Sequence, residues 1–262
     1  MATARGINYR VGRWELAAVN RKEDVLLVQR LLKQAAKVLR DPALDPKSES
    51  GTINKDATKS NTIKAMEAFQ RRNGRKATGL FYPRGKSITK LLVLGTPVAW
   101  GAKVSLAFKE RVFQICAELA VKPDYLMACM AFESAETFRP NIRNPKSNAV
   151  GLIQFMGNTA KSLGTTTNAL AGMTAVRQLD YVRKYFWPYR GRLRSLEDVY
   201  LAIFTPAAIG KPADYKLYKK GTKAYSQNIG FDQNKDGAIS LAEISTAVRA
   251  KYNKGLLAGY IG

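Results

Sequence analysis

Residues 128–164, ACMAFESAETFRPNIRNPKSNAVGLIQFMGNTAKSLG, decide the predicted fold and chemistry of the chain. The stretch begins inside a helix, because Pro123 suits a first helical turn and Leu126, Met130 and Glu133 follow at helical spacing. One face of this helix therefore carries two apolar residues and ends in a carboxylate. A Glu among apolar neighbours is poorly solvated, so the pKa of Glu133 should rise until the group stays protonated near neutral pH. Such a carboxyl suits general-acid chemistry, for example protonation of a glycosidic oxygen.

The loop and turn after this helix carry two further candidate residues. Residues 139–147 are rich in Pro and Asn and read as a loop. Gly151 would let the backbone approach a ligand or a neighbouring helix closely. Gln154 is an amide between Ile153 and Phe155, and a buried amide needs hydrogen-bond partners, which an N-acetyl sugar could supply.

At these residues the sequence resembles the lytic transglycosylases that have a goose-type-lysozyme-like domain. More narrowly, the whole chain resembles modular bacteriophage endolysins, in which a peptidoglycan-binding domain precedes such a catalytic domain. One departure is Gly157, where many relatives have Pro, and it should affect the next helix start more than the chemistry. The motifs that carry the resemblance are Glu133-Ser134, Ser147, residues 151–156 and Thr159-Ala160.

The resemblance implies a peptidoglycan-cleaving enzyme with Glu133 as its acid and base. The bond cleaved would be the β-1,4 bond between N-acetylmuramic acid and N-acetylglucosamine. Ser147, Gly151 and Gln154 would contact the substrate, and a tyrosine from a later helix, for which Tyr200 and Tyr215 are the candidates, would help to orient the carboxyl. No cofactor is required by this chemistry.

The sequence marks out no second carboxylate, although glycoside hydrolases usually use two. The candidates are Glu136, Glu197 and Asp198, and Glu136 is expected to be a solvated residue at the helix end. A single carboxyl fits lytic transglycosylation, which gives 1,6-anhydro-muramic ends without consuming water. Two alternatives stay open: a lysozyme-type hydrolase of the same bond, and a virion-associated or basic wall-binding protein without enzymatic activity.

Composition narrows the partners and the chemistry. The 262 residues include 43 Lys and Arg against 20 Asp and Glu, a net charge of +23, which implies an anionic partner. Nucleic acid is the commonest such partner, but the charges are dispersed and no zinc-finger or RNP pattern supports it. The anionic surface of a bacterial envelope would serve equally well, and it is the partner that the resemblance implies. The absence of histidine excludes a His-dependent triad, and Cys116 and Cys129 are expected to be small buried hydrophobes rather than a disulfide.

The predicted fold is all-α, with a small domain before a larger one. Residues 1–98 carry helical patterns at 25–40, near 61–72 and at 87–94, and resemble the small helical peptidoglycan-binding domain; a generic three-helix bundle is the alternative. Asp24 is expected to cap the first of these helices. Residues 99–105, with an exposed Trp100, are expected to form a linker, and residues 106–262 the lysozyme-like catalytic domain.

A second motif, in residues 232–243, fits a twelve-residue calcium loop. The alternative is a polar turn with a capping box between Ser240 and Glu243 and no metal. If calcium binds, the sequence separation from Glu133 makes it structural rather than catalytic. Gly237 falls at the tight turn and Ile239 at the apolar anchor, and the oxygen ligands would come from Asp232, Asn234, Asp236, Ala238, Ser240 and Glu243.

The sequence also gives expectations about location. Arg5, Arg10 and Arg13 interrupt any apolar leader, and no apolar run is long enough to cross a bilayer. We therefore expect a monomer held in the host cytoplasm that needs a separate, holin-type route to the periplasm and the wall. The resemblance also leads us to expect peptidoglycan of the Gram-negative type.

Overall fold

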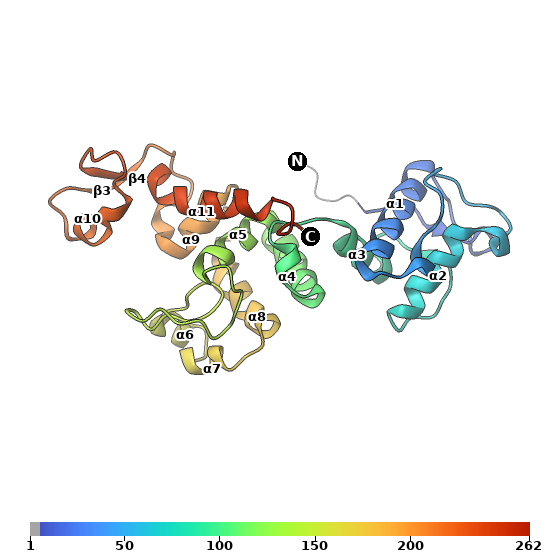
Figure 1. Cartoon of the computed structure of the whole chain (residues 1–262), viewed down its shortest axis with the longest axis horizontal. Helices are drawn as coiled ribbons and strands as arrows, with labels where there is room; N and C mark the ends of the chain where they lie inside the picture. The colour runs from blue at the N-terminus through green and yellow to red at the C-terminus, as the bar shows by residue number, and fades with distance from the viewer. Residues whose placement is uncertain (1–5) are drawn as a thin grey trace. The chain divides into compact units, whose positions relative to one another are not determined.

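A computed structural model describes residues 6–262, so Arg5 lies outside the described residues. The chain divides into two compact units, Met1–Pro97 and Val98–Gly262. Both units are built mainly from helices, which confirms the predicted fold class (Figure 1). In the described part of the chain, no helix is long and apolar enough to cross a membrane.

The first unit is a small helical domain around one apolar core. Its helices α1 (Lys22–Leu39), α2 (Asn61–Arg72) and α3 (Lys86–Gly95) pack together, and β1 (Val11–Gly12) pairs antiparallel with β2 (Leu80–Phe81). Ser60 caps α2 by accepting a hydrogen bond from the Ile63 N–H. The core contains Val25, Val28, Leu32, Ile63, Met66, Phe69, Phe81, Ile88 and Leu91.

The start of α1 differs from expectation, and a buried amide on the same helix binds the loop that follows it. Asp24 does not cap α1, because the helix begins at Lys22; its buried carboxylate instead accepts hydrogen bonds from the backbone of Asn8 and Tyr9. Gln29 is fully buried on α1, where its amide binds the backbone of Gly51 and Thr52. A buried amide thus fixes the long polar loop that follows the helix.

The second unit consists of eight α-helices of different lengths that follow Ser105, with one two-stranded sheet. Ser105, Thr174 and Ser195 cap the helices that follow them, and Ser195 with Asp198 forms a capping box. The strands β3 (Lys216–Lys219) and β4 (Ala238–Ser240) are antiparallel. The helices are α4 (Leu106–Leu119), α5 (Pro123–Glu133), α6 (Gly157–Ser162), α7 (Thr167–Ala171), α8 (Ala175–Phe186), α9 (Leu196–Phe204), α10 (Lys223–Asn228) and α11 (Leu241–Gly255).

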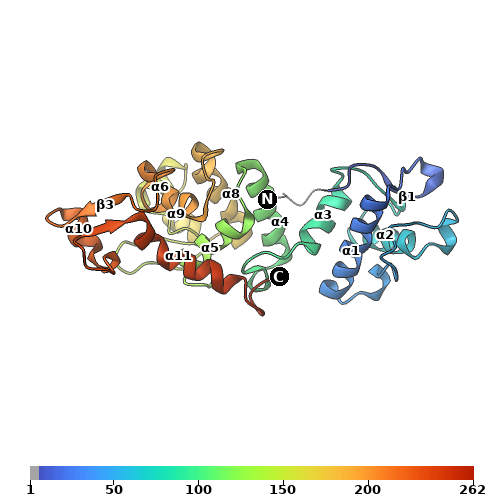
Figure 2. The same ribbon diagram turned by 90° about the horizontal axis from the view of Figure 1, so that it is seen from above.

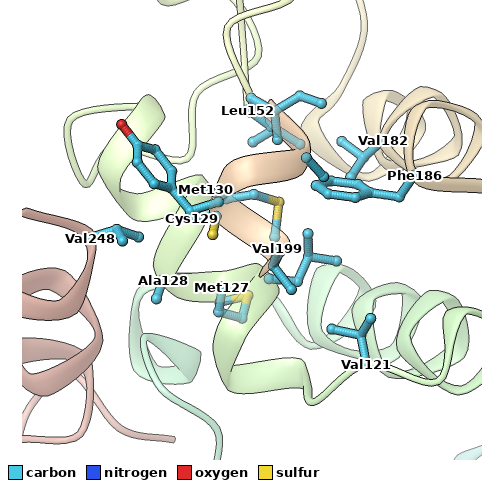
Figure 3. Packing of buried hydrophobic residues seen from close by; sticks show 14 of the residues in the cluster. Val121, Met127, Ala128, Cys129, Met130, Leu152, Val182, Phe186, Val199 and Val248 are labelled. Carbon is cyan, nitrogen blue, oxygen red and sulfur yellow. The ribbon is translucent and has the colours of Figure 1, made fainter. Parts of the chain in front are cut away.

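Helix α5 lies at the centre of the second unit. Helices α4, α9 and α11 all pack against it, and α11 runs alongside it in both views (Figures 1 and 2). Six consecutive residues, 126–131, are buried, so the helix is apolar all round and needs partners on every side. Figure 3 shows its residues 127–130 between side chains from its neighbours, including Leu152, Phe186, Val199 and Val248. Cys116 and Cys129 are free and buried in this core, as predicted.

The expected linker at residues 99–105 is instead part of the second unit. Trp100 is fully buried, and its indole N–H donates to the Lys251 carbonyl at 2.9 Å. The prediction of an exposed Trp100 was therefore wrong. The reason is that the two ends of the unit pair with each other: Val98 N–H donates to the Gly262 carbonyl at 2.9 Å, and Gly262 N–H returns a bond at 3.2 Å. These bonds carry Trp100 beneath the end of α11.

Candidate functional site

Glu133 is the last residue of α5, where the helix breaks into a tight turn. Ser134 is buried and holds this turn, because its hydroxyl donates to the Met130 carbonyl at 2.6 Å and accepts from the Phe138 N–H at 3.0 Å. Ala135, Glu136 and Phe138 adopt positive φ angles, which non-glycine residues rarely do. The turn ends the helix at Glu133, so its carboxyl lies at the edge of the apolar core.

The Glu133 carboxyl is half-buried and has no ion-pair partner within the described residues. Burial raises its pKa from the ordinary 4.5 to about 7, with no contribution from a neighbouring charge. The group is therefore about half protonated at neutral pH, and it can give up a proton and take it back. This agrees with the behaviour predicted from its apolar neighbours.

Two tyrosines lie within electrostatic reach of Glu133. Tyr200, on α9, is buried with its ring edge-on to Phe132 at 5.4 Å; burial raises its pKa, and the Glu133 charge adds to the rise. Tyr185, on α8, has its pKa raised to about 12 by burial first, with smaller effects of Tyr189 and Glu133. The Tyr185 hydroxyl donates to the Ala202 carbonyl at 2.8 Å, which ties α8 to α9.

Tyr215, the other predicted tyrosine, lies outside this group. Its ring is exposed just before β3, with the Lys211 ammonium 5.4 Å from the ring centre. Its backbone carbonyl accepts from the Leu241 N–H, so the contact it makes is with the start of α11. The structure therefore associates Tyr200 with Glu133 and does not associate Tyr215 with it.

Gly151 makes its close approach to a helix, one of the two alternatives that the sequence left open. Its φ is +83°, and a Cβ at this position would lie 2.2 Å from Oε1 of Gln178 on α8. The Gln178 amide is fully buried: Oε1 accepts from the Leu152 N–H at 2.8 Å, and Nε2 donates to the carbonyls of Pro140 and Leu170 at 2.9 Å each. Gly151 is thus required for the contact that positions this loop.

Gln154 and Ser147 take up different positions in the same loop. Gln154 is half-buried at a φ of +52°, and its Nε2 donates to the Gly151 carbonyl at 3.1 Å. Ser147 is exposed at the tip of the loop, where its N–H donates to Oδ1 of Asn144 at 3.2 Å. A bridge between Arg143 and Val150 closes this tip. Gln154 therefore lies against the ordered part of the loop, while Ser147 faces solvent.

Each candidate for a second carboxylate is engaged elsewhere. Glu136 is not the solvated residue expected, since Lys251 and Lys254 of α11 each bind it at 2.6 Å. Asp198 is buried in the capping box of α9 and also accepts from the Gly210 N–H at 2.9 Å. Glu197 pairs with Arg249. None of the three raises the pKa of Glu133.

The predicted calcium loop lies between α10 and α11. Asn234 and Asp236, at its third and fifth positions, are exposed. Asp232 and Ala238, at the first and seventh, are half-buried, and Ser240 and Glu243, at the ninth and twelfth, are buried. The predicted capping box between Ser240 and Glu243 is present. Across residues 6–262, no three acidic, thiol or imidazole side chains already converge as a metal site.

The sequence reasoning missed the roles of Gln178 and Tyr185. Gln178, Val182 and Phe186 follow at intervals of four residues on the buried face of α8. An amide on such an apolar face needs partners, so its position was a usable signal. For Tyr185 the sequence held no comparable signal, because tyrosines are frequent in this region.

A search of curated proteins finds no match. The Transglycosylase SLT domain model matches residues 112–180, a stretch that begins in α4, contains all of α5 and ends in α8. The match includes Glu133, Ser147, Gly151, Gln154 and Gln178. Residues 112–180 thus match an SLT transglycosylase domain, which indicates that the protein is an enzyme, a lytic transglycosylase that acts on peptidoglycan.

Proposed function

We propose that the protein cleaves the β-1,4 bond between N-acetylmuramic acid and N-acetylglucosamine by transglycosylation, with Glu133 as its only acid and base. The observation that carries this proposal is the environment of Glu133. Its carboxyl is half-buried with a pKa of about 7, and the nearby acidic candidates Glu136, Glu197 and Asp198 all have other partners. A mechanism with one carboxyl suits this arrangement better than a mechanism with two.

The reaction then has two proton transfers through the same carboxyl. The Glu133 carboxyl gives its proton to the glycosidic oxygen as the bond from this oxygen to C1 of muramic acid breaks. The Glu133 carboxylate then takes the proton of the C6 hydroxyl while the C6 oxygen bonds to C1. The products are a 1,6-anhydro-muramic end and a free N-acetylglucosamine hydroxyl, and the carboxyl is protonated again. A pKa of about 7 favours both transfers near neutral pH.

We further propose that the first unit attaches the enzyme to the wall. Support comes from a groove of about 270 Å³ in this unit, next to β2 and the start of α3. Arg75, Lys76 and Lys86 give it positive charge, and Tyr82 exposes an aromatic ring there. Such a lining suits the carboxylates and sugars of peptidoglycan. The net charge of +23 would draw the chain to an anionic envelope.

The two proposed activities together fit a monomeric phage endolysin that acts on peptidoglycan of the Gram-negative type. An enzyme domain joined to a wall-binding domain keeps the active site close to its insoluble substrate, because attachment raises the local concentration of cleavable bonds. In this role the protein would collect in the host cytoplasm and reach the wall by a separate, holin-type route.

Mass spectrometry of the muropeptides released from purified Gram-negative peptidoglycan tests the chemistry. We expect 1,6-anhydro-muramic ends from the native protein and no release by Glu133→Gln, which keeps the shape of the side chain and removes its acid function. Reducing muramic ends would instead identify a lysozyme-type hydrolase and contradict the one-carboxyl mechanism. Lysis by folded Glu133→Gln would remove Glu133 from its role.

Sedimentation with purified peptidoglycan tests the attachment. The protein to use is the full chain with Glu133→Gln, so that the wall stays intact. Adding Arg75→Glu and Lys86→Glu should lower the bound fraction severalfold. Lys37→Glu with Lys64→Glu, at exposed positions on α1 and α2, is the control with the same number of charge reversals in the same unit. Equal losses with the control would mean that general charge, rather than the groove, holds the wall.

A further inference from the structure

The loop at residues 232–243 has the backbone of a helix–loop–helix cation site. It lies between α10 and α11, and both helices contact the β3–β4 pair (Figure 1). Gly237, at the sixth position, has a φ of +78°, and its N–H donates to Oδ2 of Asp232 at 3.1 Å. The Ala238 N–H donates to Oδ1 of Asp236 at 2.8 Å. The backbone of the loop therefore folds around the carboxylates of Asp232 and Asp236, at its first and fifth positions.

One buried oxygen atom of this loop lacks a hydrogen-bond partner within the described residues. Oδ1 of Asp232 is fully buried and has no hydrogen-bond partner within the described residues. The other oxygen of the same carboxylate accepts from the Tyr225 hydroxyl at 2.5 Å and from Gly237. A buried carboxylate oxygen without a partner is costly, and in proteins such an oxygen is satisfied by a donor, a water or a cation. This observation is independent of the spacing of the motif.

The other two carboxylates of the loop are held by hydrogen bonds. Oε2 of Glu243 accepts from the Ser240 N–H at 2.8 Å and from the Ser240 hydroxyl at 2.6 Å. Oε1 of Glu243 accepts from the Gln233 N–H at 3.2 Å, so this oxygen already faces the loop. Oδ2 of Asp236 accepts from the Lys216 ammonium at 2.7 Å.

We propose that residues 232–243 bind one Ca²⁺ ion through side-chain oxygens of the loop and one backbone carbonyl. The buried oxygen of Asp232 would be a ligand that needs no rearrangement. Twelve residues with a bidentate Glu at the end suit the six to eight ligands of Ca²⁺ better than the compact octahedron of Mg²⁺. The full ligand set would be Asp232, Asn234, Asp236, the carbonyl of Ala238, Ser240 directly or through water, and Glu243.

Binding must compete with two contacts in the structure. Asp236 would exchange Lys216 for the ion, and Glu243 would turn from the Ser240 cap toward the centre of the loop. With both contacts made, the acidic side chains of the described residues do not converge. They also place the expected dissociation constant toward the weak end for such loops, at about 10⁻⁴ to 10⁻³ M.

The proposed ion would stabilise the start of α11 rather than take part in the chemistry. It would join β4 and the first turn of α11 to the end of α10. Helix α11 packs along α5. Its Lys251 and Lys254 form ion pairs with Glu136, which lies three residues after Glu133 in the chain. Ordering α11 should therefore raise the melting temperature of the second unit.

Calorimetric titration of the chelator-treated full chain with CaCl₂ tests the proposal, and it needs no wall substrate, so its outcome is independent of the proposed activity. We expect one site per chain. Glu243→Gln keeps the hydrogen bonds of the capping box but removes the charge, so it should weaken binding at least tenfold. Lys216→Gln removes the competitor of the ion and should tighten binding severalfold.

Terbium luminescence gives a second readout. Tyr225 lies against Asp232, so its ring should sensitise Tb³⁺ bound in the loop, and Ca²⁺ should quench the signal by displacement. Tyr225→Phe keeps a ring but removes the hydroxyl, so the sensitised signal should fall while Ca²⁺ still binds. Absence of binding at millimolar Ca²⁺, or binding that neither Glu243→Gln nor Lys216→Gln alters, would overturn the proposal.

Discussion

Replacing Glu133 by Gln should change the pH dependence of stability in a defined direction. The folded pKa of Glu133 is about 7 because of burial, against an ordinary value of 4.5. Below the lower value the carboxyl is protonated in the folded and the unfolded chain alike, so it makes no pH-dependent contribution. Between the two values the folded chain keeps a proton that the unfolded chain has lost, so stability falls as pH rises. Above about pH 7 the whole loss is present.

The size of this loss follows from the two pKa values. A difference of about 2.5 between 4.5 and about 7, at about 1.4 kcal/mol per pKa unit, gives about 3.5 kcal/mol. Gln cannot ionise, so Glu133→Gln avoids the cost. The variant should therefore gain most of this free energy, about 3 kcal/mol, relative to the native protein between about pH 4 and about pH 9.

Urea unfolding of the native protein and of the Glu133→Gln variant, each at about pH 4 and at about pH 9, measures the effect. Tryptophan fluorescence reports on the second unit through the buried Trp100. Comparing the variant with the native protein at each pH cancels the groups that titrate equally in both. A stability difference that does not change with pH would mean that Glu133 titrates as an ordinary surface carboxyl, and the argument for a buried acid would fail.

The same pKa predicts that kcat/KM falls as pH rises past about 7.

Three further predictions concern the loop, the tyrosines and the charge. Gly151→Ala should destabilise the second unit by about 2 kcal/mol or more in thermal melting, because its Cβ would meet Gln178 at 2.2 Å and its φ is positive; Gly157→Ala, with nothing within 4 Å, should change little. Tyr200→Phe should keep the ring packing and the melting temperature but lower kcat if its hydroxyl orients Glu133, whereas Tyr215→Phe should leave kcat unchanged; equal effects would remove Tyr200 from this role. Raising NaCl to about 0.5 M should release the inactive Glu133→Gln chain from walls in sedimentation assays, since screening shortens the reach of its positive field, and undiminished attachment would count against electrostatic capture.

Local signals predicted much of the fold. Ser60, Ser105 and Ser195 each begin a helix by an interaction within four residues, so the sequence alone reveals them. Pro123 and the helical spacing of Leu126, Met130 and Glu133 likewise predicted the helix whose apolar face ends in Glu133. These features depend on neighbours along the chain, which a reader of the sequence can see.

Contacts between distant residues account for what the sequence did not reveal. Trp100 looked exposed because its partner, the Lys251 carbonyl, lies 151 residues away. Glu136 looked solvated because the two lysines that hold it are on α11. For the candidate site, the sequence singled out Glu133 and Tyr200 but gave Tyr215 equal weight, since only the packing of α9 against α5 brings one tyrosine near the carboxyl.

The backbone pairing of Val98 with Gly262 has a consequence for how the second unit can be connected to other modules. Because the first and last residues of the unit are hydrogen-bonded to each other, a module attached to either end leaves from the same place on its surface. Moving a module from one end of the unit to the other would therefore change the order of the modules in the sequence, but not the place on the surface of the unit where the module is attached. The same neighbouring ends would let a short peptide close the unit into a ring, with new termini opened in an exposed loop.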